Sequence, residues 1–280
     1  MNKHAIKAAR KLIEIALKDD VGDGDITTNS IVPAEIRRKA KMVAKADGVI
    51  AGLPVAEMVF RKLDPDLIWN ELVKEGDKVK NGDVLVEFKG SYRALLTGER
   101  TALNFLQRLS GIATMAAKYA DEVKDFNTTI LDTRKTLPGF NRLDKYAVKT
   151  GGASNHRHGL HDMVMIKDNH IEVAGGITPA VLAVRSNISH GIKIEVETTT
   201  LAQVQEAIAV KADIIMLDNM DIETMRKSIE LIAGRAKIEA SGNITLDRLR
   251  EIASTGVDFI SVGALTHSVS ALDISQRIED

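Results

Sequence analysis

The second half of the chain alternates between short apolar runs and longer segments with apolar residues at helical spacing. The apolar runs have strand length and lie at residues 129–131, 163–166, 192–196, 214–217, 238–240 and 259–262. Helical patterns between the later runs occupy residues 179–189, 201–210, 221–233 and 246–255. Because strands that alternate with helices pair side by side in the same direction, this part is predicted to form a parallel sheet covered by helices.

The first part of the chain has a different pattern. Residues 5–18 carry apolar side chains at helical spacing and predict an amphipathic helix. Over residues 38–88, short alternating runs separated by Asp-Gly, Glu-Gly and Asn-Gly pairs predict β-hairpins, with one helix at 54–62. A continuous apolar stripe then predicts a long helix over residues 92–124, which marks the passage from a first domain to a second.

Polar or small residues follow each of the six predicted strands. In chain order they are Asp132-Thr133-Arg134-Lys135, Lys167-Asp168, Glu197, Asp218-Asn219, Ser241-Gly242 and Gly263. In a parallel α/β barrel the carboxyl ends of the strands form one face, and that face carries the active site. Six strands are fewer than the eight of the standard barrel, so we expect an incomplete, open α/β barrel. The first domain or a second subunit could cover its gap.

The stretch from Asp132 to Ile171 concentrates cations at predicted turns and strand ends. It contains Arg134, Lys135, Arg157 and Lys167 together with His156, His158, His161 and His170, interrupted by Gly151-Gly152. A surface helix would alternate such cations with carboxylates, whereas side chains at strand ends converge on a ligand. The pattern therefore suits a small polyanion, such as a dicarboxylate or a phosphorylated sugar.

Carboxylates and small residues complete the predicted strand-end face. Glu197 and Asp218 end adjacent strands, where they could hold a divalent ion through oxygen ligands. The alternative is that Glu195 and Glu197 form a solvent-facing pair at period two, and this alternative has more weight for Glu195. Small residues at 241–243 and 261–264 follow the last two strands, where backbone amides can approach a phosphate.

The histidine cluster and one helix arginine allow more than one interpretation. His156, His158 and His161 have a spacing that could bind zinc, but Arg157 lies inside the triplet and no cysteine is present. We favour hydrogen bonding from histidine to an anion, with a raised pKa; His158 and His161 could also be loop or interface residues. Arg100 is either a solvated helix arginine or a cation that reaches into a site, including that of another subunit.

Composition limits the class of protein. The 280 residues are 44% hydrophobic and 28% charged, as in an ordinary globular protein with a large core. A net charge of -1 argues against a surface coated for nucleic acid, so the basic cluster indicates a focused site. The absence of cysteine excludes disulfides, thiolate zinc sites and cysteine nucleophiles. We expect a cytoplasmic protein, because neither a secretory signal nor an apolar run of roughly 20 residues is present.

Nine motifs together closely resemble the quinolinate phosphoribosyltransferase family. They are ALKDDVGDGDITT, ADGVIAG, GERTALNFLQRLSGIAT, DTRKTLPGFNRLDKYAVKTGGASNHRHGL, IKDNH, IEVET, LDN, ASGNIT and ISVGALTHSV. The resemblance runs nearly end to end, and the long central motif is highly specific. It implies an N-terminal α/β sandwich domain at residues 1–110 and an incomplete α/β barrel, the catalytic domain, at residues 111–265. Residues 266–280 could pack back onto the first domain.

The resemblance also implies an activity. The family transfers a phosphoribosyl group from phosphoribosyl pyrophosphate to quinolinate with decarboxylation, which gives nicotinate mononucleotide, pyrophosphate and CO2 for NAD biosynthesis. It implies Mg²⁺ as the cofactor. It further implies a homodimer or higher homo-oligomer whose sites combine residues of both chains.

Roles for individual residues follow from the same resemblance. The quinolinate carboxylates are assigned to Arg134, His156, Arg157 and Lys167, with Arg100 contributed by the partner subunit. The ribose and the magnesium pyrophosphate are assigned to Lys135, Lys167, Glu197 and Asp218, of which Glu197 and Asp218 are the metal ligands. The 5-phosphate is assigned to Ser241, Gly242 and Gly263, and Thr133 is a further substrate-binding residue. Asn243 departs from the family pattern, in which a second glycine is common, so its role stays open.

Two other interpretations remain at this point. A paralogue associated with molybdenum-transport loci shares the architecture, although the full set of cations weighs against it. A non-catalytic anion- or metal-binding barrel would use the histidine cluster as its site. Such a protein would retain zinc through purification and would show no dependence on phosphoribosyl pyrophosphate.

Overall fold

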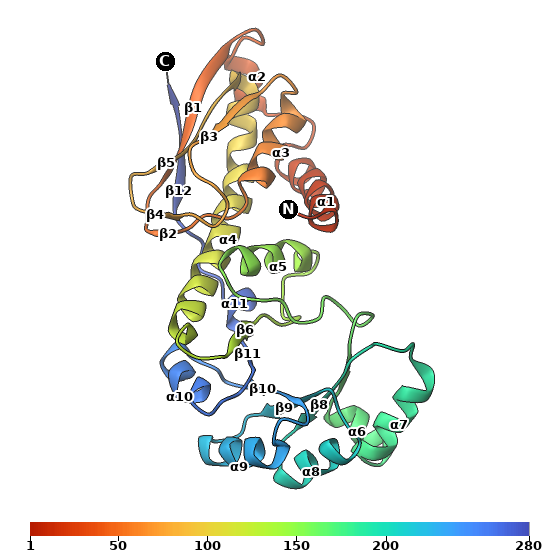
Figure 1. Cartoon of the computed structure of the whole chain (residues 1–280). Coiled ribbons are helices and arrows are strands. Elements are labelled where there is room, and N and C mark those ends of the chain that lie inside the picture. The colour runs from red at the N-terminus through yellow and green to blue at the C-terminus, as the bar shows by residue number, and fades with distance from the viewer. Residues whose placement is uncertain (280) are drawn as a thin grey trace. The chain divides into compact units, whose positions relative to one another are not determined.

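The computed structural model describes residues 1–279, which form two compact units. The first unit comprises residues 1–117, 136–152 and 264–279, and the second comprises residues 118–135 and 153–263. The chain therefore leaves and re-enters the first unit, as the colours in Figure 1 allow the reader to follow. No helix within residues 1–279 combines the length and the apolar character needed to cross a membrane.

The first unit is a mixed α/β unit. Its helices are α1 (Lys3–Val21), α2 (Ile26–Ile31), α3 (Leu53–Leu63), most of α4 (Tyr92–Val123), α5 (Asn141–Thr150) and α11 (Ala264–His267). Its strands are β1 (Arg37–Ala44), β2 (Gly48–Val49), β3 (Ile68–Glu71), β4 (Lys78–Val79), β5 (Val84–Ser91) and β12 (Ile274–Glu279). The three helices predicted at 5–18, 54–62 and 92–124 are confirmed, whereas α5 was not predicted.

The strands of the first unit do not pair as hairpins. The main sheet has the order β12-β1-β5-β3, and β2 pairs with β4. The hairpin prediction was therefore wrong: Gly76 and Gly82 provide turns with positive φ, yet the strands that flank each turn pair elsewhere. A turn sets only where the chain reverses. Which strands pair depends on the apolar surface that the paired strands bury together. A two-residue strand such as β4 buries too little apolar surface to form a stable hairpin with β5.

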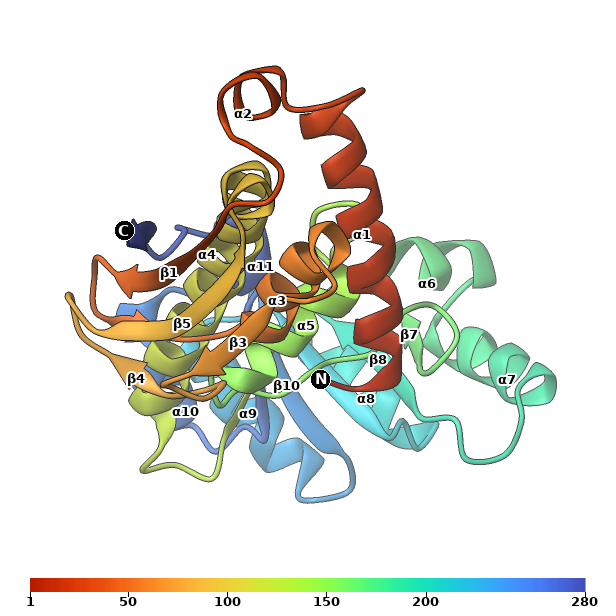
Figure 2. The same cartoon turned by 90° about the horizontal axis from the view of Figure 1, so that it is seen from above.

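Aromatic packing joins α3 to the sheet. Phe60 of α3 is fully buried, with its ring 5.1 Å from that of Phe88 on β5 and 6.2 Å from that of Trp69 on β3. Aromatic pairs at such centroid distances stabilise a core beyond the area that they bury. Figure 2 shows α3 lying beside these strands.

One half-buried and one buried carboxylate, Glu75 and Asp64, fix loops and helix ends in the first unit. Glu75 accepts hydrogen bonds from the amides of Gly52 (2.9 Å) and Leu53 (2.8 Å) at the start of α3, and from the Tyr146 hydroxyl of α5. Burial raises the pKa of Glu75 and that of Tyr146. A buried carboxylate depends on each of its donors, since an unsatisfied charge in the core is costly.

Asp64, at the end of α3, is the second such carboxylate. It accepts hydrogen bonds from the amides of Ser91 (2.7 Å) and Asp66 (3.1 Å) and forms an ion pair with Arg37 at 3.1 Å. Burial raises the pKa of Asp64, but these donors outweigh burial and hold the pKa below its usual value. Asp64 thus contributes to stability in its ionised form.

The second unit is built on a six-stranded parallel sheet. Its strands are β6 (Thr129–Leu131), β7 (Val164–Ile166), β8 (Ile194–Thr198), β9 (Ile214–Asp218), β10 (Lys237–Ser241) and β11 (Phe259–Ser261). Its helices are α6 (Asp168–Ala174), α7 (Ile177–Asn187), α8 (Leu201–Ala209), α9 (Ile222–Ile232) and α10 (Leu249–Ala253), the last preceded by a 3₁₀ turn at Leu246–Arg248. All six predicted strands and the later helices are confirmed, and α6 was missed. Figure 1 shows α8 and α9 next to each other along the strands.

The sheet is open between its first two strands in sequence. Its order is β6-β11-β10-β9-β8-β7, so β6 and β7 are the two edges. Part of the free edge of β6 is occupied by residues 153–156: the Ser154 amide donates to the Ile130 carbonyl at 2.8 Å, and the Asp132 amide donates to the Ser154 carbonyl at 3.1 Å. The prediction of an open, incomplete α/β barrel beside an N-terminal α/β unit is confirmed.

Candidate active site

Strand register brings the predicted polar residues to one face of the parallel sheet. Glu197 of β8 and Glu239 of β10 are both in register with Met216 of β9 between them. Asp218 of β9 is likewise in register with Ser241 of β10. Because residues in register point to the same side of a sheet and alternate along each strand, these side chains share one face.

Two guanidinium groups form the cationic part of the site. Arg134 is exposed in the loop after β6, and Arg157 is half-buried, with Nη1 donating to the Met163 carbonyl at 3.0 Å. Burial lowers the pKa of Arg157, and the nearby charge of Arg134 lowers it further. Within residues 1–279 neither guanidinium forms an ion pair with a carboxylate. The charges of Glu195 and Asp162 act on Arg157 in the opposite direction without forming an ion pair, so both guanidinium groups keep donors for an anion.

A lysine and two carboxylates lie at the ends of β7, β8 and β9. Lys167 Nζ is 3.5 Å from Glu197 Oε2, and their side chains are 47% and 17% exposed. Burial raises the pKa of Glu197, and the neighbouring charge of Asp218 adds to the increase while Lys167 opposes it. A bound cation would relieve the repulsion between these two carboxylates. Lys135 is exposed after β6, and its amide donates to Thr133 Oγ1 at 3.1 Å.

The loops after β9 and β10 are tied together by side-chain amides. Asn243 Nδ2 donates to Asn219 Oδ1 at 3.0 Å, and Asn219 Nδ2 donates to Asp218 Oδ2 at 2.8 Å. Asn219 and Asn243 both have positive φ, a conformation that asparagine tolerates better than most residues. The Asn243 side chain is thus held against Asn219.

Gly242 is required by this arrangement. Its φ is +92°, and a Cβ atom there would lie 2.3 Å from Asn219 Oδ1. A cavity of about 280 Å³ opens beside the loop, lined by Asn219, Asp221, Gly242, Asn243 and Arg248 together with apolar side chains. Backbone amides at such a glycine can approach a phosphate closely.

His156 precedes Arg157 in the chain and is buried. Its Nε2 atom is 3.1 Å from Glu195 Oε2 and 3.3 Å from Glu239 Oε2. Its own amide donates to Asp132 Oδ1 at 2.9 Å, and its Nδ1 accepts from the Arg157 amide at 2.7 Å. Burial lowers the pKa of His156, but the two glutamates outweigh it and raise the pKa to about 9.

Two family models match consecutive parts of the chain. The N-terminal domain of quinolinate phosphoribosyl transferase matches residues 25–110, and the C-terminal domain of the same enzyme matches residues 112–277. The chain belongs to the quinolinate phosphoribosyltransferase family.

Relatives in this family are similar along almost the whole chain. A probable nicotinate-nucleotide pyrophosphorylase [carboxylating] of Synechocystis is 49% identical over 94% of this chain and 90% of its own length. A Bacillus subtilis protein of the same description is 45% identical over 96% of this chain and 93% of its own. The solved structure of the nicotinate-nucleotide pyrophosphorylase from Francisella tularensis has a TM-score of 0.93 at 40% identity, covering 98% of this chain and 96% of that one.

In this family member, most of the predicted site residues lie in the second unit. They are Thr133, Arg134, Lys135, His156, Arg157, Lys167, Glu197, Asp218, Ser241, Gly242 and Gly263. Arg100 lies in the first unit, exposed on α4. The roles assigned to these residues stay predictions. For His156 the prediction is direct contact with substrate, whereas in the structure both of its ring nitrogens face protein groups.

The structure corrects the interpretation of two polar clusters. Glu195 is fully buried, so the solvent-facing alternative was wrong for this residue: its face of β8 points to the interior. His156 gathers with Glu195 and Glu239, not with His158 and His161, so the three-histidine zinc cluster does not form within residues 1–279. The physical reason is that His156 turns inward from the edge of β6 while His161 stays exposed.

Sequence reasoning missed two residues around the site: Glu239 is fully buried beside His156, and Arg248 lines the cavity next to Gly242. Asp132 was named among the strand-end residues without a role; it is fully buried and accepts a hydrogen bond from the His156 amide. A signal existed for Glu239, since a carboxylate between Ile238 and Ala240 interrupts an apolar strand two positions before a predicted site residue. Arg248 lies on a turn after a strand, where arginine is usually solvated.

Proposed function

We propose that this chain catalyses the transfer of a phosphoribosyl group from phosphoribosyl pyrophosphate to quinolinate with decarboxylation, as a glycosyltransferase of NAD biosynthesis. The observation that carries the proposal is the pair of neighbouring guanidinium groups, Arg134 and Arg157, in the same unit as a carboxylate pair and a glycine loop. The guanidinium groups suit a dicarboxylate. The carboxylate pair, through a metal ion, and the glycine loop suit a phosphorylated sugar with its pyrophosphate. The names of relatives at 45–49% identity support it.

The carboxylate pair fits a magnesium ion. Glu197 and Asp218 offer hard oxygen ligands from adjacent strands, and their mutual repulsion would fall when a cation binds. We infer that these two residues hold Mg²⁺ together with the pyrophosphate oxygens. The ion would supply positive charge where the leaving pyrophosphate gathers negative charge.

Lysine and arginine side chains would position the two substrates for transfer. In this step the pyridine nitrogen of quinolinate forms a bond to the anomeric carbon as the bond from that carbon to pyrophosphate breaks. Lys135 and Lys167 would stabilise the departing oxygens, and Arg134 and Arg157 would hold the ring in line through its carboxylates. Alignment of this kind can lower a barrier by several kcal/mol of roughly 7–11 available.

Decarboxylation follows from the charge of the alkylated ring. Once bonded to ribose, the ring nitrogen is positive and stabilises the electron pair left on the neighbouring carbon when CO2 departs. A proton then replaces the carboxyl group and gives nicotinate mononucleotide. Cations that bound the departing carboxylate tightly would oppose this loss, so we expect the arginines to act chiefly on the carboxylate that stays.

We further propose a homodimer or higher homo-oligomer in the cytoplasm, with Arg100 of one copy completing the quinolinate site of another. Exposure of Arg100 on α4 leaves its guanidinium accessible for this role. A mixture of inactive Arg100→Ala and inactive Lys167→Ala subunits should then recover partial activity, because a mixed dimer contains one intact site. No recovery in proven mixed dimers would contradict shared sites.

The reaction is tested by offering quinolinate, nicotinate and orotate separately to the purified protein with magnesium and phosphoribosyl pyrophosphate. Mass spectrometry should find nicotinate mononucleotide from quinolinate alone, with equal release of pyrophosphate. Omission of the metal, or its removal with a chelator, should abolish turnover. No product from quinolinate would overturn the proposal, and retained zinc would then favour a binding protein.

A further inference from the structure

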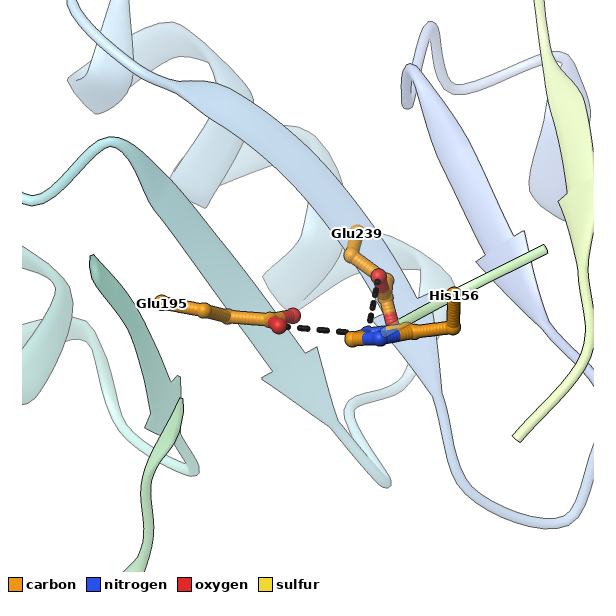
Figure 3. A group of neighbouring side chains, drawn as sticks. All are labelled: His156, Glu195 and Glu239. Atoms are coloured by element: carbon orange, nitrogen blue, oxygen red, sulfur yellow. Dashed lines mark ion pairs between the residues drawn. The ribbon is translucent and has the colours of Figure 1, made fainter. Parts of the chain in front are cut away.

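Three buried side chains from distant segments meet inside the second unit. His156 comes from the segment along the free edge of β6, Glu195 from β8 and Glu239 from β10, as Figure 3 shows. Both glutamates are fully buried, and His156 is 9% exposed. Within residues 1–279 the four carboxylate oxygens have no hydrogen-bond partner of good geometry, so the imidazole is the group that these charges face.

The orientation of the imidazole decides what this cluster can do. Nδ1 lies 2.7 Å from the Arg157 amide, and Nε2 lies 3.1 Å and 3.3 Å from the two carboxylates, which favour a proton on Nε2. One histidine and two glutamates also form a suitable ligand set for a metal ion, which would have to displace the Nε2 proton on binding. Within residues 1–279 Nε2 thus faces both carboxylates at ion-pair distance, without a hydrogen bond of good geometry, while the Arg157 amide contacts the other side of the ring.

Fixing the ring also fixes the backbone that carries Arg157. The His156 amide is held by Asp132 at 2.9 Å, and the Arg157 amide is held by the His156 ring. The guanidinium of Arg157 is then oriented through the Met163 carbonyl at 3.0 Å. Arg157 follows the segment that lies along the free edge of β6, where no further strand of the sheet supports the backbone. Glu195 of β8 and Glu239 of β10 supply this support through the His156 ring.

We propose that Glu195 and Glu239 are positioning residues for quinolinate recognition, which hold Arg157 in place through the His156 ring. This inference rests on the proposed function. It assigns the two glutamates to quinolinate, because Arg157 is assigned to the quinolinate carboxylates, whereas Lys135, Glu197, Asp218, Ser241 and Gly242 are assigned to phosphoribosyl pyrophosphate.

The first test replaces Glu239, which is more distant in sequence from the inferred metal ligands than Glu195. Glu239→Ala should raise the KM for quinolinate about tenfold or more, while the KM for phosphoribosyl pyrophosphate changes by less than about twofold. Glu239→Gln keeps a carbonyl acceptor for the Nε2 proton and should restore much of the quinolinate affinity. Equal changes in both KM values, or no change in either, would overturn the proposal.

A matched control separates positioning from general support of the fold. Glu206 lies in the same unit and accepts a hydrogen bond from the Thr178 amide at 2.7 Å, away from His156. Glu206→Ala, which removes this acceptor, should lower the melting temperature without moving either KM. If Glu239→Ala does not fold, Glu239→Gln still decides the question, since it should shift the quinolinate KM by about threefold or more and the other KM by less.

A double-mutant cycle tests whether Glu239 acts through Arg157. With Arg157→Ala already present, Glu239→Gln should raise the quinolinate KM by less than about twofold, because the group that it positions is gone. Full additivity of the two effects would defeat the inference. An inactive wild-type protein would instead refute the proposed function, so the two failures can be told apart.

Discussion

Replacement of Gly242 by alanine should cause both backbone strain and a clash with Asn219 in the loop assigned to the 5-phosphate. Comparison with a glycine that has similar φ and no such neighbour separates the two effects. Gly242 has φ of +92°, and an added Cβ would lie 2.3 Å from Asn219 Oδ1 and 2.7 Å from its Nδ2. Such distances force the Asn219 amide to move. It would then lose its hydrogen bonds with Asn243 and Asp218, which measure 3.0 Å and 2.8 Å.

The magnitude follows from these two contributions. A left-handed conformation costs an ordinary residue about 1–2 kcal/mol, and each lost hydrogen bond costs about 0.5–1.5 kcal/mol. The second contribution, about 1–3 kcal/mol, falls on the residues that would meet the phosphate. Since about 1.4 kcal/mol corresponds to tenfold in affinity, Gly242→Ala should raise the KM for phosphoribosyl pyrophosphate by about 5-fold to 150-fold.

Gly256→Ala is the matched control. Gly256 has φ of +97°, close to that of Gly242, but a Cβ there would meet nothing within 4 Å. Urea unfolding should therefore show a loss of about 1–2 kcal/mol for Gly256→Ala, with unchanged steady-state kinetics. Both KM values would be measured for both variants. A KM for phosphoribosyl pyrophosphate within about twofold of wild type in Gly242→Ala, or an equal rise in Gly256→Ala, would refute the reasoning.

Three further predictions concern single side chains. Arg157→Ala should lower kcat/KM for quinolinate by an amount that corresponds to a loss of about 2–5 kcal/mol of transition-state binding. Arg226→Ala, which removes an exposed arginine, should leave kcat/KM unchanged. Equal kcat/KM values for the two variants in steady-state kinetics would contradict the anion site. Tyr146→Phe removes a donor from the half-buried Glu75 carboxylate and should lower the free energy of unfolding by about 1–3 kcal/mol, measured in urea. The lowered pKa of Asp64 means that its contribution is present above the unfolded value of 3.8 and is lost as the pH falls through the folded pKa. Wild type should therefore exceed Asp64→Asn in stability at pH 7, and the difference should shrink below pH 3.8; a constant difference would show that the carboxylate charge is not responsible.

Local patterns were sufficient where local physics decides the outcome. The six apolar runs of the second half became strands, and the residues that follow them came to one face, because the carboxyl ends of parallel strands must meet at one edge of a sheet. The charges of Arg134 and Arg157 near Gly151-Gly152 predict an anion site from the sequence, and this site stays a prediction. Strand existence and strand polarity thus follow from the order of residues alone.

Partner choice and the inner side of each strand required the tertiary structure. Parallel strands are buried on both faces, so the sequence around Glu195 and Glu239 does not tell which side points inward. Likewise the glycine turns near Gly82 do not say that β1 would choose β5 and β12 as its neighbours. The sequence by itself determined where strands form and which charges follow them. Only the folded chain decided which distant groups meet, because the burial that joins His156 to Glu195 and Glu239 exists only once the sheet has assembled.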